Sequence, residues 1–122
     1  MPSAPVPPAS VVYKICPLQS WLSARSSGAL APSRDDQRDG YVHLSAAHQV
    51  RGSLTRHFGG QPDLVLLALD VEQLPAGALA WETSRDGQLF PHLYGVLSAD
   101  LVSRVIEVTV DDQGQPQLPE GF

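Results

Sequence analysis

A histidine and a hydroxyl stand at strand spacing in residues 40–45, whose sequence is GYVHLS. Side chains two positions apart in a strand point to the same face, so His43 and Ser45 would lie side by side, opposite their apolar neighbours. Ser45 also has a residue type that caps helices, and the unpaired N–H groups of a helix N-terminus attract a phosphate or a polarised oxygen. The pair therefore predicts a ligand-binding site. The alternative is a buried histidine bonded to the backbone beside a serine that only caps.

A second histidine, His92, stands two positions before the phenol of Tyr94 in residues 89–95, with sequence LFPHLYG. Together they could position a polar substrate, and the ring of Tyr94 could stack on a base or a sugar. Pro91 has no backbone donor, so this stretch is expected at the edge of a sheet or at the end of a strand. The alternative is a buried tyrosine beside a surface histidine.

A carboxylate and a guanidinium follow Trp81 in residues 81–85, with sequence WETSR. The apolar ring of Trp81 could raise the pKa of Glu82, or Arg85 could pair with Glu82 and keep it ionised. As a surface ion pair, the two side chains would contribute only about 0–1 kcal/mol to stability. As functional groups, Glu82 could stabilise positive charge and Arg85 could hold an anion.

Metal and redox chemistry have less support in the sequence. His43, His92 and Glu82 have the residue types of a two-histidine, one-carboxylate metal site. No two of them stand at ligand spacing on one helix, so no metal is predicted. The single cysteine, Cys16, has no CxxC partner and cannot form an internal disulfide, which fits a reducing compartment.

The elements that must position these groups are predicted from apolar patterning. Strands are expected over residues 11–15, 41–44, 63–70, 80–83, 89–93 and 101–110. The run 63–70 has no polar alternation, which is typical of a central strand covered on both faces. Because strands and helices do not alternate regularly, the expected fold class is α+β, with small mixed or antiparallel sheets and two main helices.

The first main helix is expected to begin at Pro17 and to stop at Gly28, with Leu18, Trp21 and Leu22 in its apolar stripe. The second is expected to follow the GYVHLS segment, with Ser45 as its cap, and to run to residue 58. Its apolar side chains recur at spacings of three and four. A histidine near its end, at position 57, is expected to be solvated.

Length and composition fit one domain. The chain has 122 residues, which is the usual size of a single domain. Residues 1–10 carry four prolines and lack the features of a signal peptide, so they are expected to form a flexible leader. Residues 11–110 are expected to form the globular domain, with a surface loop over residues 29–40. Residues 111–122 are polar, with glycine and proline throughout, and are expected to form a flexible tail.

Charge narrows the class of partner. The net charge is −5 and the isoelectric point is about 5.1, which argues against binding to duplex nucleic acid. No stretch approaches the roughly 20 apolar residues of a membrane span. A cytoplasmic protein with a small-molecule ligand is therefore expected, and the oligomeric state is not indicated.

The segments that carry polar groups resemble a bacterial family known as a domain of unknown function, family 952. The resemblance rests on residues 39–45 (DGYVHLS), 63–67 (DLVLL), 81–85 (WETSR) and 89–95 (LFPHLYG), together with Trp21 and Gly28. It covers nearly all of residues 11–110. The family is grouped by fold with ADP-ribosyltransferase-like proteins, which hold an NAD-like ligand in a split β-sandwich of two small sheets. The resemblance therefore implies that fold and a nucleotide ligand.

The resemblance also implies roles for single residues. His43 would hold the ribose, Tyr94 would stack on nicotinamide, and Glu82 would stabilise an oxocarbenium-like transition state. In these proteins the order along the chain is histidine, tyrosine, glutamate, whereas here Glu82 precedes Tyr94. The remaining ligand contacts would come from Ser45, Arg85 and His92.

Two hypotheses about function follow. The first is an enzyme that acts on NAD, ADP-ribose or a related phosphorylated nucleotide, with NAD as substrate. The second is a non-catalytic module that holds a small metabolite or a partner segment in the same pocket. The four side chains of His43, Glu82, His92 and Tyr94 are therefore expected to converge within about 10 Å around a concave surface.

Overall fold

The computed structural model describes residues 9–122 and has the α+β fold that the sequence predicts. Its helices are α1 (Leu18–Ser27), α2 (Arg34–Asp39) and α3 (Ala47–Phe58), with short 3₁₀ turns at Val71–Gln73, Arg85–Gly87 and Ala99–Leu101. Its strands are β1 (Val11–Pro17), β2 (Ala29–Leu30), β3 (Val42–His43), β4 (Ser45–Ala46), β5 (Leu64–Asp70), β6 (Leu79–Thr83), β7 (Leu89–Leu93), β8 (Leu97–Ser98), β9 (Val102–Val110) and β10 (Pro116–Gln117). Most of the expected leader, residues 1–8, lies outside the described part of the chain.

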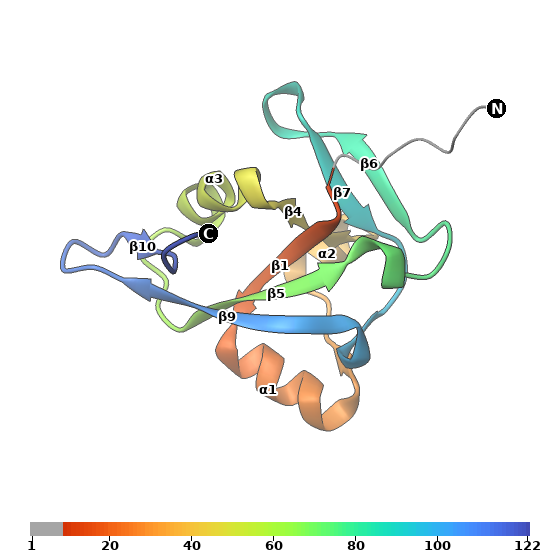
Figure 1. The fold of residues 1–122 in the computed structure, drawn as a ribbon, viewed down its shortest axis with the longest axis horizontal. Coiled ribbons are helices and arrows are strands. Elements are labelled where there is room, and N and C mark those ends of the chain that lie inside the picture. The colour runs from red at the N-terminus through yellow and green to blue at the C-terminus, as the bar shows by residue number, and fades with distance from the viewer. Residues whose placement is uncertain (1–8) are drawn as a thin grey trace.

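The main sheet has five strands in the order β10-β9-β5-β1-β4, and each neighbouring pair is antiparallel. Its central strand is β5, as the unbroken apolar run predicts. Val65 and Leu67 pack with Ala24 of α1, whereas Leu64 and Leu66 pack with residues of α3. The two main helices therefore cover opposite faces of the sheet, as Figure 1 shows.

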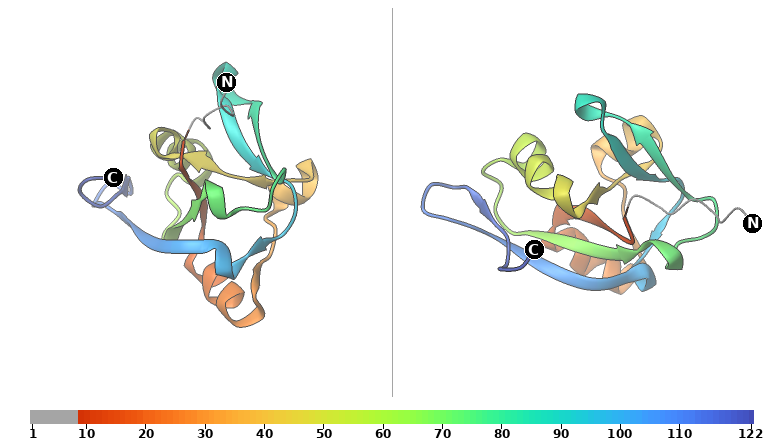
Figure 2. Two further views of the ribbon diagram at one scale, coloured as in Figure 1. Left: turned by 45° about the vertical axis from the view of Figure 1, so that its right-hand side comes forward. Right: turned by 45° about the horizontal axis from the view of Figure 1, so that its top comes forward.

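A three-stranded sheet in the order β3-β7-β6 holds the polar segments. In Figure 2 its β6–β7 hairpin, drawn in teal, projects from the main sheet on the side where α3 lies. The hairpin turns through Asp86 and Gly87, whose φ angles of 57° and 72° lie in the left-handed region. A two-stranded sheet, β2-β8, joins the end of α1 to the segment after β7.

The expectation that Pro91 marks a sheet edge is wrong, because β7 is the middle strand of its sheet. The carbonyl oxygen of Pro91 accepts a hydrogen bond from the backbone N–H of Leu44 at 3.1 Å. The reciprocal bond of that pair is the one that Pro91 cannot donate. Since β3 ends at His43, the missing donor falls where the partner strand stops.

The surface loop predicted for residues 29–40 is also wrong, because this stretch contains β2 and α2. Ser33 caps α2: its hydroxyl accepts from the N–H of Asp36, and the Asp36 carboxylate accepts from the N–H of Ser33. This reciprocal capping box stabilises a helix of only six residues. The helix ends at Gly40, which has a positive φ of 83°.

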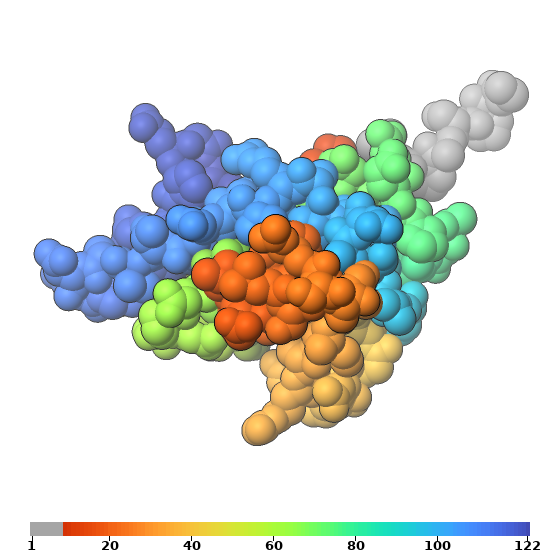
Figure 3. Space-filling view, turned by 90° about the horizontal axis from the view of Figure 1, so that it is seen from below, coloured from red at the N-terminus to blue at the C-terminus, as the bar shows by residue number. Residues whose placement is uncertain are grey.

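The predicted helix α1 forms and ends at Gly28, which is in the left-handed conformation. Of its expected apolar stripe, Trp21 packs against the first core cluster, whereas Leu18 and Leu22 are 36% and 39% exposed. The helix also buries Ala24. Figure 3 shows α1 at the surface, lying across the sheet beside β9.

The residues expected to form a flexible tail contain β10, which pairs with β9. Phe122 lies against Tyr13 with ring centroids 5.1 Å apart, and Leu118 packs against the same core cluster as Phe122. Packed structure therefore continues beyond Val110 (Figure 1).

Candidate functional site

A cavity of about 380 Å³ opens between α2, α3 and the β3-β7-β6 sheet. Among the predicted site residues, those that line it are His43, Ser45, Arg85 and His92. Residues that the sequence did not single out add Arg38, Asp39, Tyr41, Ser53, Arg56 and Phe90. Glu82 and Tyr94 are not part of its wall, although both lie close behind it.

His43 has both ring nitrogens next to carboxylates of α2. Nδ1 lies 2.7 Å from Asp36 and Nε2 lies 2.9 Å from Asp39. An ionised carboxylate only accepts, so both contacts are hydrogen bonds when His43 is the imidazolium, which donates from both nitrogens. In this arrangement neither nitrogen is left to hold a ligand, and His43 presents only the rest of its ring to the cavity.

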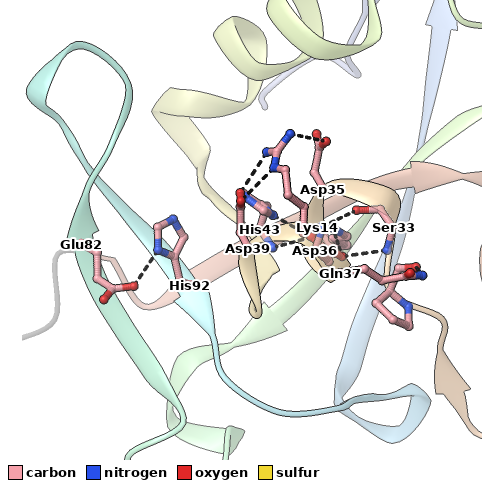
Figure 4. Close-up of polar contacts among 11 residues, drawn as sticks. Lys14, Ser33, Asp35, Asp36, Gln37, Asp39, His43, Glu82 and His92 are labelled. Atoms are coloured by element: carbon pink, nitrogen blue, oxygen red, sulfur yellow. Dashed lines mark hydrogen bonds and ion pairs between the residues drawn. The ribbon is translucent and has the colours of Figure 1, made fainter.

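Asp36 anchors the histidine from beneath and is itself buried. Its carboxylate accepts from Lys14 Nζ at 2.9 Å and from the backbone N–H groups of Ser33 and His43 at 3.0 Å each (Figure 4). Burial would raise the pKa of Asp36, but the hydrogen bond from His43 and the charge of Lys14 outweigh burial and hold it below its usual range. The site therefore rests on an ionised carboxylate linked to β1.

The arginines of the cavity differ in how far their charge is already matched. Arg38 Nε donates to Asp39 at 2.8 Å, and this hydrogen bond lowers the pKa of Asp39 to about 2. Arg56 Nη2 lies 3.9 Å from Asp86 Oδ2. Arg85 differs from both, because no carboxylate within residues 9–122 lies at ion-pair distance from it.

Arg85 is held by an aromatic ring and a hydroxyl. Its guanidinium carbon lies 4.9 Å from the ring centroid of Phe90, and Nη2 lies 3.5 Å from Ser53 Oγ. The alternative of an ion pair between Arg85 and Glu82 is not found, since Glu82 bonds to His92 and Tyr94. A Cβ built on Gly52 would lie 3.2 Å from Arg85 Nη2, so the guanidinium lies directly against the backbone of α3.

Ser45 does not cap α3, which corrects the sequence prediction. It belongs to β4, pairs with Tyr13 of β1 and is held extended by that pairing. The helix begins at Ala47, and Gln49 Oε1 accepts from the backbone N–H of Ala46 at 3.0 Å in the place of a serine cap. The hydroxyl of Ser45 lies 3.0 Å from that of Ser53, so two linked buried hydroxyls reach Arg85 through Ser53.

Glu82 is bound by two side chains of the neighbouring strand. His92 Nδ1 and the Tyr94 hydroxyl each lie 2.7 Å from Glu82 Oε1. The hydrogen bond from Tyr94, followed by that from His92, lowers the pKa of Glu82. The alternative that Trp81 raises this pKa is therefore wrong, and Trp81 packs against the first core cluster instead.

Tyr41 joins the two histidines and was missed by sequence reasoning. Its ring stacks on His92 at 3.9 Å and 20°, and lies 4.7 Å from the ring of His43 and 5.4 Å from that of Tyr94. The rings of His43 and His92 are 5.8 Å apart. The four side chains expected to converge therefore lie together, but around the ring of Tyr41, and of those four only His43 and His92 line the cavity. The position of Tyr41 two residues before His43 is a strand-spacing signal that could have found it.

His57, expected to be solvated, also lines the cavity from the end of α3. Burial lowers its pKa, and the charge of Arg85 lowers it further. Among the residues that the structure describes, no group of three or more histidine, cysteine, aspartate or glutamate side chains could hold a metal ion. Across the same residues, no helix is long and apolar enough to cross a bilayer.

Comparison with known proteins places this geometry in a family. The chain is similar to protein CC0527 from Caulobacter crescentus: the crystal structure is 40% identical, with a TM-score of 0.82 over 88% of this chain and 93% of that chain. The solution NMR structure of CC0527 is 38% identical, with a TM-score of 0.82 over 93% and 97% of the two chains. No curated protein matches the chain significantly. The family described as "Protein of unknown function (DUF952)" matches residues 15–105, and the chain belongs to it.

Proposed function

We propose that the cavity binds a small phosphorylated molecule of the nucleotide class, with ADP-ribose and NAD as the first candidates. The observation that carries the proposal is the environment of Arg85. A planar guanidinium matches two oxygens of a phosphate group, and an arginine whose charge no carboxylate balances has its donors available for an anion. The Ser53 hydroxyl accepts from Arg85 Nη2 and is hydrogen-bonded to the Ser45 hydroxyl, so one proton of this serine pair is not used between them and is a further donor.

The size and lining of the cavity support the same ligand class. Its volume of about 380 Å³ lies within the range of pockets for small organic molecules. Phe58, Leu44 and the edge of Phe90 supply apolar surface, and Tyr41 supplies an aromatic ring. A ligand with an anionic group at one end and a sugar or base at the other would use both kinds of surface.

The charge around the cavity favours the phosphate near Arg85 over other positions. Arg38 already donates to Asp39 and lies 3.3 Å from Asp35. Arg85 has no such carboxylate partner, and its charge contributes, after burial, to the lowered pKa of His57, which Asp35 only partly offsets. An anion placed between these two groups would relieve the repulsion between them.

The test is calorimetric titration of ADP-ribose, NAD and AMP into wild type and Arg85→Ala. Loss of a hydrogen bond between charged groups costs roughly 1.5–3 kcal/mol, so affinity should fall by about 10- to 150-fold. Arg25→Ala is the matched control, because Arg25 is exposed in the last turn of α1 and does not line the cavity. Equal affinity of Arg85→Ala and wild type, or no binding of any of these ligands by wild type, contradicts the proposal.

A further inference from the structure

The Nε2 atom of His92 has no role in the binding site described above. His92 is buried and lines the cavity, with Nδ1 held by Glu82 at 2.7 Å. Within residues 9–122, no protein atom forms a hydrogen bond with its Nε2. In the same range, every fully buried side-chain nitrogen or oxygen atom has a hydrogen-bond partner, so Nε2 is not a fully buried atom. Nε2 therefore keeps a small solvent-accessible surface, and the cavity is the space that His92 lines. In Figure 4 this nitrogen points away from Glu82.

The contacts of His92 set which nitrogen carries the proton. The ionised carboxylate of Glu82 can only accept, so Nδ1 donates and neutral His92 keeps its lone pair on Nε2. The Tyr94 hydroxyl donates to the same Glu82 oxygen at 2.7 Å, and Tyr41 stacks on the imidazole at 3.9 Å. The imidazole is therefore fixed in both tautomer and orientation, which is the arrangement of a prepared proton acceptor.

We propose that His92 is a general base that activates water for hydrolysis of a phosphate ester bound in the cavity, with Glu82 and Tyr94 as positioning residues. The proposal rests on the proposed function, because Arg85 must hold the phosphate group. In this role the pair of Glu82 and His92 does not stabilise an oxocarbenium ion, because Glu82 would have to reach the cavity to do so.

Hydrolysis of the ester needs only a water molecule from solvent and the side chains of the cavity. The water oxygen forms a bond to phosphorus while one water O–H bond breaks and its proton moves to His92 Nε2. The bond from phosphorus to the alkoxide or phenoxide oxygen breaks with its electron pair, and the imidazolium returns the proton to that leaving oxygen. Arg85 stabilises the charge on the phosphoryl oxygens, and Glu82 stabilises the imidazolium.

The experiment measures release of p-nitrophenolate from p-nitrophenyl phosphate and bis(p-nitrophenyl) phosphate. General-base catalysis contributes roughly 10²–10⁴-fold, so His92→Ala should lose that factor in kcat. Binding of inorganic phosphate, measured by calorimetry, should persist. Added imidazole should restore part of the rate to His92→Ala, which a merely structural role of His92 would not allow.

Glu82→Gln tests the positioning role. It should lower kcat more than it changes KM, and in ¹⁵N spectra it should alter the signals of the His92 ring nitrogens. Glu107→Gln is the matched control, because Glu107 is exposed on β9 and does not line the cavity. If His92→Ala does not fold, as thermal unfolding would reveal, His92→Gln replaces it in the kinetic comparison.

The outcomes separate the two proposals. If wild type binds inorganic phosphate but releases no p-nitrophenolate from either ester, the hydrolytic role is overturned and the binding function stands. If wild type binds neither phosphate nor ADP-ribose, both fall. Wild-type ¹⁵N spectra that place the proton on Nε2 of neutral His92 also overturn the general-base role.

Discussion

The carboxylate of Asp36 connects the wall of the cavity to the main sheet. It is bound by Lys14 of β1, by the cap of α2 at Ser33 and by His43 of β3. The side chains of Lys14 and Asp36 are only 6% and 2% exposed, so neither charge has much access to water. Removing one partner of a buried pair leaves the other charge without compensation.

We expect Asp36→Ala to lower the free energy of unfolding by about 3–5 kcal/mol, measured by urea denaturation at pH 7. The pKa of Asp36 is lowered in the folded state, so its contribution is complete above the ordinary carboxyl pKa of about 3.9. It is lost as the pH falls through the folded-state pKa. The difference between variant and wild type should therefore shrink below about pH 4.

Asp35→Ala is the control for that variant. Asp35 lies in the same helix and pairs with Arg38, but its side chain is 52% exposed. Its removal should change stability by no more than about 0.5 kcal/mol. Equal effects of the two substitutions would contradict the role given to the buried pair.

His57 should report ligand binding through its titration. Burial lowers its pKa, and the charges of Arg85 and Arg56 lower it further, while Asp35 opposes them. An anion bound at Arg85 cancels part of this repulsion, so the pKa of His57 should rise on binding. By linkage, affinity for ADP-ribose should increase as the pH falls through the titration range of His57.

NMR titration of the His57 ring with and without saturating ADP-ribose measures this effect directly. His48 is an internal reference, since it lies on the same helix but does not line the cavity, and its signals should not respond to the ligand. A pKa of His57 that stays constant or falls on saturation would show that the anion does not bind beside Arg85.

At the scale of elements, α2 shows why sequence reasoning failed in one region. The spacing from Ser33 to Asp36 is that of a capping box and was present in the sequence. The helix has no apolar periodicity, however, because its buried residue is the aspartate itself. A search for apolar faces therefore cannot find a helix whose packing depends on an ion pair with Lys14.

The site was predictable where it depended on strand spacing and residue type. His43, Ser45, Arg85 and His92 all line the cavity, and the unbroken apolar run correctly gave the central strand. The partners of Glu82 were not predicted, because they depend on the register of the β6–β7 hairpin. Since Ala80 pairs with His92 and Glu82 pairs with Phe90, Glu82 and His92 are diagonal neighbours on one face.

Helix α3 permits a test that separates stability from binding. Gly52 lies in its interior, where alanine is favoured over glycine by about 0.5–1 kcal/mol. A Cβ at this position would lie 3.2 Å from Arg85 Nη2 and should displace the guanidinium. We expect Gly52→Ala to retain or slightly raise thermal stability while weakening ADP-ribose binding in calorimetry.

Thr55→Ala provides the comparison for this substitution. Thr55 is exposed on the same helix and is absent from the lining of the 380 Å³ cavity. Its replacement should raise helix propensity and leave affinity unchanged. Unchanged affinity in Gly52→Ala as well would mean that contact with the α3 backbone does not position Arg85.

At the scale of the whole molecule, the main sheet separates two apolar cores that differ in what closes them. The core on the α1 side extends to the β3-β7-β6 sheet through Leu93 and Val42. The core on the α3 side is closed at its margin by Leu118 and Phe122. The C-terminal segment therefore serves as a third layer over α3 and β1 and contributes no residue to the lining of the cavity.

Phe122→Ala tests whether this segment contributes to the stability of the domain. The ring lies 5.1 Å from that of Tyr13, and the guanidinium carbon of Arg51 lies 6.0 Å from its centroid. Because Phe122 is only partly buried, we expect the free energy of unfolding to fall by about 1–2 kcal/mol in urea denaturation, less than for a fully buried phenylalanine.

Glu120→Ala is the control, because Glu120 is exposed in the same segment and its replacement should have no comparable effect. Affinity for ADP-ribose should be the same in both variants, since neither residue lines the cavity. If Phe122→Ala is as stable as wild type, the segment does not stabilise the domain, and the flexible tail expected from composition is supported instead. If its affinity for ADP-ribose is reduced, the C-terminal layer shapes the site through α3.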